Sequence, residues 1–154
     1  MEVLVDTNIL LRCADPAHRM HEGAVEAVRV LRRRGDRPCV AAQNLIEFRA
    51  VCTRPRDANG LGMSQDQAGE EIARLKVLFH VLVDFPAILS IWERLVSSYT
   101  AVGKQNHDAR IVAAMLAHEV HTVLTFNKED FIRYPEIAVI TPQDLAAGPG
   151  PSRP

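Results

Sequence analysis

The feature that most constrains this chain is its opening stretch, residues 3–11, where a short apolar run is interrupted by three polar residues and then resumes. Residues 3–5 have no alternating polar neighbours, which is typical of a parallel strand covered by helices on both faces. Such a strand brings Asp6 to the carboxyl end of a sheet, the edge at which open α/β sheets bind ligands. The competing interpretation is that Asp6 or Asn8 only caps the following helix.

The rest of the chain alternates between short apolar runs and longer amphipathic runs, which we interpret as the strands and helices of an α/β protein. Further strands are expected at 37–41, 81–83, 120–124 and 138–140, and helices at 8–14, 21–34, 42–52, 64–78, 86–100 and 106–118. A central, mostly parallel sheet in one domain over residues 1–142 is therefore predicted. The last residues are rich in glycine and proline, and we expect a disordered tail over residues 143–154.

Composition and charge exclude several classes of protein. Eighteen basic residues against nineteen acidic ones give a formal net charge of −1, so no overall field draws the chain to nucleic acid or to a membrane. Met1 leads straight into the first strand, and no apolar run is long enough to span a bilayer, so a cytoplasmic location is expected. The cysteines are odd in number and lack CxxC spacing, so we expect reduced thiols at Cys13, Cys39 and Cys52.

Two further carboxylates lie on apolar helical faces, where an unpaired charge is unfavourable. Glu47 falls on an apolar flank of helix 42–52, with Arg49 on nearly the opposite side. Asp108 falls in the apolar stripe of helix 106–118. Each has an ordinary alternative role. Glu47 would form a salt bridge with an arginine, and Asp108 would only offset the dipole at the start of its helix.

Polar residues also follow the strand at 120–124. Thr125 and Asn127 would reach the same edge of the sheet as Asp6, unless they serve only as turn or cap residues. Lys104, in the polar loop before helix 106–118, is the best candidate for a contact with a phosphate, with a solvated lysine as the alternative. The arginines late in helix 21–34 form a basic face that is either solvated or an RNA-backbone patch.

Four segments, in order along the chain, resemble the motifs of PIN-domain ribonucleases, and especially the VapC-type toxins of VapBC toxin–antitoxin pairs. No single segment is specific, but together they span about residues 1–142. They are Val-Asp-Thr-Asn-Ile-Leu at 5–10, Asn-Leu-Ile-Glu-Phe at 44–48, His-Asp-Ala-Arg-Ile-Val at 107–112 and Leu-Thr-Phe-Asn-Lys-Glu-Asp-Phe at 124–131.

The resemblance implies a three-layer α/β/α sandwich whose acidic site binds Mg²⁺ or Mn²⁺ and hydrolyses RNA phosphodiesters. Asp6, Glu47 and Asp108 match the metal-binding carboxylates of the family, and Thr125 and Asn127 complete the expected catalytic set. The chemistry agrees, because carboxylates gathered in one place repel one another unless a cation neutralises them, and hard divalent metals prefer oxygen ligands.

The chain departs from the family pattern at Asn127, where many members carry a fourth acid. A neutral amide lowers the negative charge of the site, so it is open whether one metal binds or two. Asp130 is the alternative fourth acid, although the Asp-Phe pair also resembles a structural feature of that segment. Thr7 and Asn8 are expected to support the site through hydrogen bonds to its ligands.

The resemblance also implies partners: an RNA substrate, a second copy of the chain, and a cognate antitoxin whose tail presents a basic side chain to the acidic site. Trp92 lies on the apolar face of helix 86–100, which we interpret as core or dimer packing rather than a surface for stacking a cofactor. The rival function is that of an inert PIN-like module that binds RNA or protein without turnover.

Other nucleotide- and phosphate-handling folds fit less well. A haloacid-dehalogenase-like phosphatase would need an acid where Asn8 stands, and no residue matches the phosphorylated aspartate of a receiver domain. The sequence contains neither a P-loop nor a GxGxxG motif, which disfavours nucleotide binding.

Overall fold

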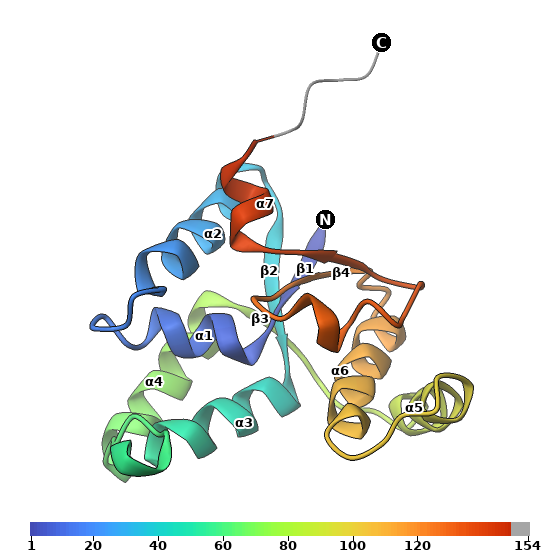
Figure 1. The fold of residues 1–154 in the computed structure, drawn as a ribbon, viewed down its shortest axis with the longest axis horizontal. Helices are drawn as coiled ribbons and strands as arrows, with labels where there is room; N and C mark the ends of the chain where they lie inside the picture. The colour runs from blue at the N-terminus through green and yellow to red at the C-terminus, as the bar shows by residue number, and fades with distance from the viewer. Residues whose placement is uncertain (149–154) are drawn as a thin grey trace.

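A parallel five-stranded sheet organises the protein, and β1 lies at its centre (Figure 1). The computed structural model describes residues 1–148. The strand order is β3-β2-β1-β4-β5, and every neighbouring pair is parallel. The strands are β1 Glu2–Val5, β2 Arg37–Ala41, β3 His80–Leu82, β4 Thr122–Leu124 and β5 Ala138–Ile140.

The predicted nature of the first strand is confirmed. Val3, Leu4 and Val5 are each 0% exposed, and β1 pairs with β2 on one side and with β4 on the other. Because successive side chains of a strand point to opposite faces, Val3 and Val5 belong to one core cluster and Leu4 to the other. A run that is apolar on both faces is stable only in such a doubly covered position.

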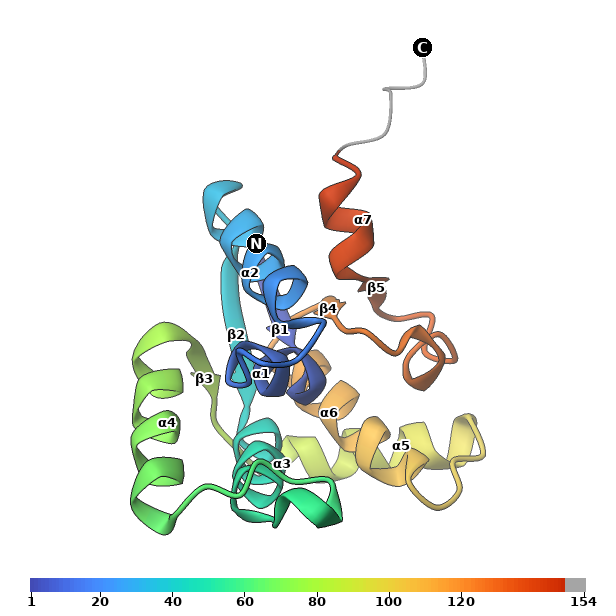
Figure 2. The same cartoon turned by 60° about the vertical axis from the view of Figure 1, so that its left-hand side comes forward.

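Helices cover both faces of the sheet, which makes the expected three-layer α/β/α sandwich. The helices are α1 Thr7–Cys13, α2 His21–Arg33, α3 Ala42–Thr53, α4 Gln65–Leu78, α5 Ala87–Ser98, α6 Gln105–Ala117 and α7 Pro142–Ala146, with 3₁₀ turns η1 Arg56–Ala58 and η2 Lys128–Asp130. One core cluster joins the sheet to α1, α2, α3 and α4, and the other joins it to α5 and α6. The two groups of helices lie on opposite sides in Figures 1 and 2.

The end of the chain differs from the sequence-based expectation. Helix α7 occupies residues at which the disordered tail was expected to begin, and it packs against α2. Thr141 caps this helix by accepting a hydrogen bond from the Asp144 backbone N–H (3.2 Å), and Leu145 is buried. The capping pair and the buried leucine stabilise the short helix. The remainder of the expected tail, 149–154, lies outside the described residues.

The cysteines agree with the expectation of reduced thiols. All three are free, with Cys39 and Cys52 buried and Cys13 half-buried. Burial raises the pKa of the Cys39 thiol to about 12, which keeps it protonated at neutral pH. Over residues 1–148 there is no helix both long enough and apolar enough to cross a membrane.

Two glycines in neighbouring parts of the fold should respond to the same substitution in opposite ways. A Cβ atom at Gly60 would lie 1.9 Å from the Arg54 carbonyl oxygen, so Gly60→Ala should destabilise the protein by about 2 kcal/mol or more because the backbone must shift. Gly69 is exposed inside α4 with nothing within 4 Å of such a Cβ, so Gly69→Ala should stabilise by roughly 0.5–1 kcal/mol. Urea unfolding of both variants measures the change in the free energy of unfolding. Changes of the same sign and size in the two variants would contradict the close contact described at Gly60.

Candidate functional site

Three carboxylates from separate parts of the sequence converge at the carboxyl edge of the sheet. Asp6 directly follows β1, Glu47 lies in α3, and Asp108 lies in the first turn of α6. Hydrogen bonds connect the three positions: Glu47 accepts the hydroxyl of Thr7, the neighbour of Asp6, and Gln43 donates both to Glu47 and to the carbonyl of His107, the neighbour of Asp108. The structure therefore brings the three predicted residues together, and we call them the acidic site.

Asp6 lies at the carboxyl edge of the sheet and also caps α1. One carboxylate oxygen, Oδ1, accepts the Thr7 backbone N–H at 2.8 Å and so caps α1. The other, Oδ2, accepts the Thr125 hydroxyl at 2.8 Å. The side chain is only 7% exposed, so these two bonds fix its orientation within the acidic site.

Thr125 is the centre of a small hydrogen-bond network that joins β1 to β4. Its hydroxyl donates to Asp6 and accepts the Asn8 side-chain amide and the Asn127 backbone N–H, each at 3.0 Å. The Asn8 amide oxygen in turn accepts the backbone N–H of Phe126 at 3.2 Å. Asn127 therefore joins the network through its backbone, while its exposed side chain makes no hydrogen bond to any residue of the described range 1–148.

Glu47 is held by neutral donors. The Thr7 hydroxyl donates to Oε2 at 3.1 Å, and the Gln43 amide donates to Oε1 at 2.7 Å. Within residues 1–148 no basic group forms a salt bridge with Glu47, and Arg49 instead donates to Gln65 at 2.6 Å. The salt-bridge alternative for Glu47 is therefore not what the structure contains.

Two supporting residues were missed by the sequence analysis. Gln43 is buried and also donates to the His107 carbonyl at 3.0 Å, so it ties α3 to the start of α6. Asn44 is 0% exposed, donates to the Thr7 hydroxyl at 3.1 Å and accepts the Ala41 backbone N–H at 2.9 Å. The spacing of four between Gln43 and Glu47 was the available signal, because residues four apart share a helical face.

Asp108 is the least satisfied member of the acidic site. It is 9% exposed, and its carboxylate accepts no hydrogen bond from any residue that the structure describes. Its pKa is raised to about 6, mainly by burial and also by Asp130 and Glu47, while Lys104 acts in the opposite direction. Burial likewise raises the pKa of Asp6 to about 6, although the bonds from Thr125 and Thr7 act in the opposite direction.

The chemistry of this donor set fits a divalent metal such as Mg²⁺ or Mn²⁺. All three side chains offer oxygen, and two are buried carboxylates whose charged forms lack a cationic partner in direct contact. Over residues 1–148, no three His, Cys, Asp or Glu side chains are close enough to form a complete ligand group as they stand. A metal ion bound by these residues would therefore need water or phosphate oxygens among its ligands.

Lys104 and Asp130 lie beside the acidic site. Lys104 immediately precedes α6, and its ammonium group lies 3.0 Å from the Asp130 Oδ2 atom. Both groups act electrostatically on Asp108. The two residues whose participation the sequence left open are therefore paired with each other at the border of the site.

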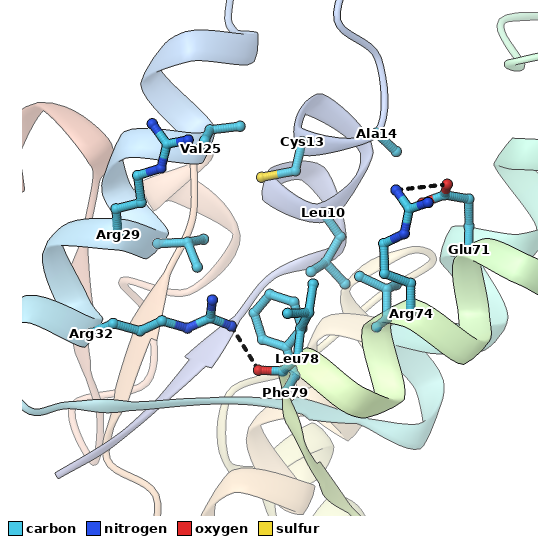
Figure 3. Close-up of a pocket in the computed structure, with 12 residues that line it drawn as sticks. Leu10, Cys13, Ala14, Val25, Arg29, Arg32, Glu71, Arg74, Leu78 and Phe79 are labelled. Carbon is cyan, nitrogen blue, oxygen red and sulfur yellow. Dashed lines mark hydrogen bonds and ion pairs between the residues drawn. The ribbon is translucent and has the colours of Figure 1, made fainter.

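A cavity of about 260 Å³ lies between α1, α2 and α4, and it is lined mainly by apolar side chains and arginines (Figure 3). Leu10, Cys13 and Phe79 contribute apolar surface, while Arg29 and Arg32 reach its border from α2. It meets the end of α1, whereas Asp6 caps the start, and the seven-residue helix separates them by about 10 Å. Arg32 donates to the Leu78 carbonyl at 2.7 Å and Arg74 pairs with Glu71 at 3.4 Å, so these arginines already have partners within the protein.

The family model described as "PIN domain" matches residues 3–137. No curated protein matches the chain. The solved structures named below are at most 19% identical to this chain, so their similarity concerns the fold alone.

Three solved structures illustrate the similarity. VapBC2 from Rickettsia felis, bound to a DNA fragment from its promoter, has a TM-score of 0.67 and 13% identity, over 92% of this chain and 98% of that one. FitAcB from Neisseria gonorrhoeae has a TM-score of 0.66 and 19% identity, over 93% and 99%. VapC20 from Mycobacterium tuberculosis, described as a toxin that cleaves the sarcin-ricin loop, has a TM-score of 0.60 and 17% identity, over 99% of each chain.

The raised pKa of Asp108 predicts how its removal changes stability with pH. In EDTA, the Asp108 carboxyl has its ordinary pKa of 3.8 in the unfolded chain and a pKa of about 6 in the folded protein. Between these pH values the unfolded chain is already charged while the folded protein still holds the proton, so the free energy of unfolding falls as pH rises from about 4 to 6. Asp108→Asn should match wild type at pH 4 and exceed it by roughly 2–3 kcal/mol at pH 7.5. Urea unfolding at the two pH values measures this.

Asp144→Asn is the matched control with the opposite sign. Lys128 and Thr141 lower the pKa of Asp144, so its charged form contributes stability above its ordinary pKa and loses it as pH falls. That variant should be less stable than wild type at pH 7.5. A markedly destabilised Asp108→Asn protein at that pH would instead identify Asp108 as a structural residue.

Proposed function

The chain belongs to the PIN domain family, and from this premise we propose that it is a divalent-metal-dependent endoribonuclease that acts as the toxin of a type II toxin–antitoxin system. The observation that carries the proposal is the convergence of Asp6, Glu47 and Asp108 at one edge of the sheet without a salt bridge to any of them in residues 1–148. Buried carboxylates in this arrangement favour a cation, and oxygen ligands favour a hard one.

Asp6, Glu47 and Asp108 would hold the metal ion. The chemistry that Mg²⁺ or Mn²⁺ supplies at such a site is activation of a water molecule and neutralisation of charge on the phosphate. Thr7 and Thr125 orient Asp6, since each donates a hydrogen bond to one of its two oxygens. Asp108 has no such donor within residues 1–148, which leaves its oxygens available to a ligand.

Thr125 and Asn127 complete the proposed catalytic set. The Thr125 hydroxyl already donates to Asp6, so its role is to position that carboxylate. The Asn127 side chain is exposed beside the network and offers an amide oxygen without charge. We assign it a weaker, neutral contact to the metal or to the substrate, because an amide neutralises no cationic charge.

The proposed partners are an RNA substrate and an antitoxin. The R. felis structure carries the name VapBC2, and the M. tuberculosis protein is described as a toxin that cleaves the sarcin-ricin loop, which supports both partners by analogy. A basic side chain on the antitoxin tail, preferably arginine, would pair with the carboxylates of the acidic site. We place the pair in the cytoplasm, where RNA is accessible to the toxin.

We also propose a homodimer that uses α5. This helix buries Ile88 and Leu95 against the sheet-side core, but Leu89 is 61% exposed and Phe85, just before the helix, is 39% exposed. Exposed apolar side chains beside a buried apolar face are compatible with packing against a second copy.

Replacing any one carboxylate of the acidic site should abolish RNA cleavage. Asp6→Asn, Glu47→Gln and Asp108→Asn each remove an anionic ligand, and the rate with Mn²⁺ should fall by about 100-fold or more. Glu129→Gln, an exposed carboxylate in η2, is the control that should keep wild-type activity. Gel analysis of total RNA with Mn²⁺ and with EDTA is the measurement. RNA binding without cleavage by the wild-type protein would favour the inert module.

Expression of the protein alone should stop growth of a bacterial host. The physical reason is degradation of RNA, so Asp6→Asn should be tolerated at the same protein level. Co-expression of the cognate antitoxin should restore growth of cells that make the wild-type protein. Colony counts and RNA integrity measure the result. Normal growth with intact RNA, at a confirmed level of wild-type protein, would contradict the assignment as a toxin.

A further inference from the structure

One ion pair spans the border of the acidic site and joins two segments that are distant in sequence. The Lys104 carbonyl accepts the backbone N–H groups of His107 (2.9 Å) and Asp108 (3.4 Å), so Lys104 lies one helical turn before Asp108. Residues four apart share a helical face, and Lys104 therefore extends along the side of α6 that carries Asp108. Its Nζ atom donates to Asp130 in η2 at 3.0 Å.

The charges around this ion pair belong to the acidic site. Asp130 is the largest electrostatic contributor to the raised pKa of Asp108, and Asp6 and Asp108 both act to raise the pKa of Lys104. Asp130 is therefore coupled to the acidic site as a fourth carboxylate. Among the charged groups that lower the pKa of Asp108, Lys104 has the largest effect.

Asp130 depends on Lys104 alone for its orientation. Within residues 1–148 its carboxylate makes no other hydrogen bond or ion pair. The Lys104 side chain is 68% exposed and the Asp130 side chain 25% exposed, so the pair can separate without disturbing the core. An exposed lysine pair of this kind is weak and reversible.

We propose that Lys104 is an internal counter-cation of the acidic site, which competes with a divalent metal for the carboxylates and, once released from Asp130, binds a phosphate of the RNA. This inference rests on the proposed ribonuclease function and adds a regulatory role to it. Its physical basis is that one lysine cannot pair fully with Asp130 and a phosphate at the same time. Release makes Asp130 available to the site and the ammonium group available to the substrate.

The chain offers a matched control, because Lys128 forms an ion pair of the same length with Asp144, 3.0 Å. The Asp144 carboxylate also accepts the Thr141 backbone N–H and hydroxyl, each at 2.9 Å, so that pair belongs to the cap of α7. Lys128 is not among the groups that shift the pKa of Asp6 or Asp108.

The first measurement is Mn²⁺ binding by calorimetry without RNA, at low ionic strength, on full-length wild type, Lys104→Gln, Lys104→Arg and Lys128→Gln. Removal of the competing charge should tighten Mn²⁺ binding by roughly three- to tenfold in Lys104→Gln. Lys104→Arg keeps the charge and should resemble wild type, as should Lys128→Gln. Because Lys104 is exposed, the difference in Mn²⁺ affinity between Lys104→Gln and wild type should shrink in 0.5 M salt, where charges are screened within about 4 Å.

The second measurement separates substrate binding from turnover at saturating Mn²⁺. Lys104→Gln should raise KM for a short RNA several-fold with little change in kcat, and the dependence of KM on salt should weaken by about one phosphate contact. Lys104→Arg should restore most of the loss. Thermal melting of each variant in EDTA verifies that the fold is retained.

The outcomes distinguish this inference from the proposed function. Equal Mn²⁺ affinity in wild type, Lys104→Gln and Lys128→Gln would overturn the inference and make the pair an ordinary surface contact. Weaker Mn²⁺ binding in Lys104→Gln would also overturn it, because Lys104 would then order the ligands. Tighter binding in Lys104→Gln, with no RNA cleaved even by wild type, would support the competition and contradict the nuclease.

Discussion

The parallel pairing of β1 with both of its neighbours is the constraint on which the rest of this protein depends. It places Asp6, at the end of β1, next to Thr125, at the end of β4, and a single hydrogen bond of 2.8 Å then joins the two strand ends. Because the strands are parallel, α3 and α6 also present their first turns to this edge. The acidic site is thus a consequence of sheet topology.

The three carboxylates of the acidic site differ in the number of hydrogen bonds that they accept, and this difference affects which groups can bind them. Asp6 and Glu47 are each held by two donors, whereas Asp108 has none within residues 1–148. Neutral donors fix orientation without cancelling charge, so the site remains strongly anionic. Positive charge is instead concentrated elsewhere, at Lys104 beside the site and at the arginines around the cavity of α1, α2 and α4.

Much of the fold was predictable because its signals are local. A doubly apolar run at residues 3–5 allows only a covered strand, and the Ser64–Gln67 capping box marks the observed start of α4. Helix α7 was missed because five residues carry little periodic pattern, and its stability depends on Leu145 packing against α2. Gln43 and Asn44 were missed because, apart from the spacing of four between Gln43 and Glu47, nothing local shows which groups a polar helical residue contacts.

The hydrophobic pattern of the sequence predicted the parallel α/β architecture, and it drew attention to Asp6 at a strand end and to Glu47 and Asp108 on apolar helical faces. Only the resemblance to PIN-domain ribonucleases implied that these three carboxylates act together. Tertiary structure alone decided what those carboxylates touch. In the folded protein Glu47 accepts hydrogen bonds from two neutral donors and pairs with no arginine, and Asp108 accepts no hydrogen bond from the described residues. Asp130 forms an ion pair with Lys104 and acts electrostatically on Asp108. The physical reason is that pKa values and hydrogen bonds depend on distances between residues remote in sequence, which no local pattern encodes.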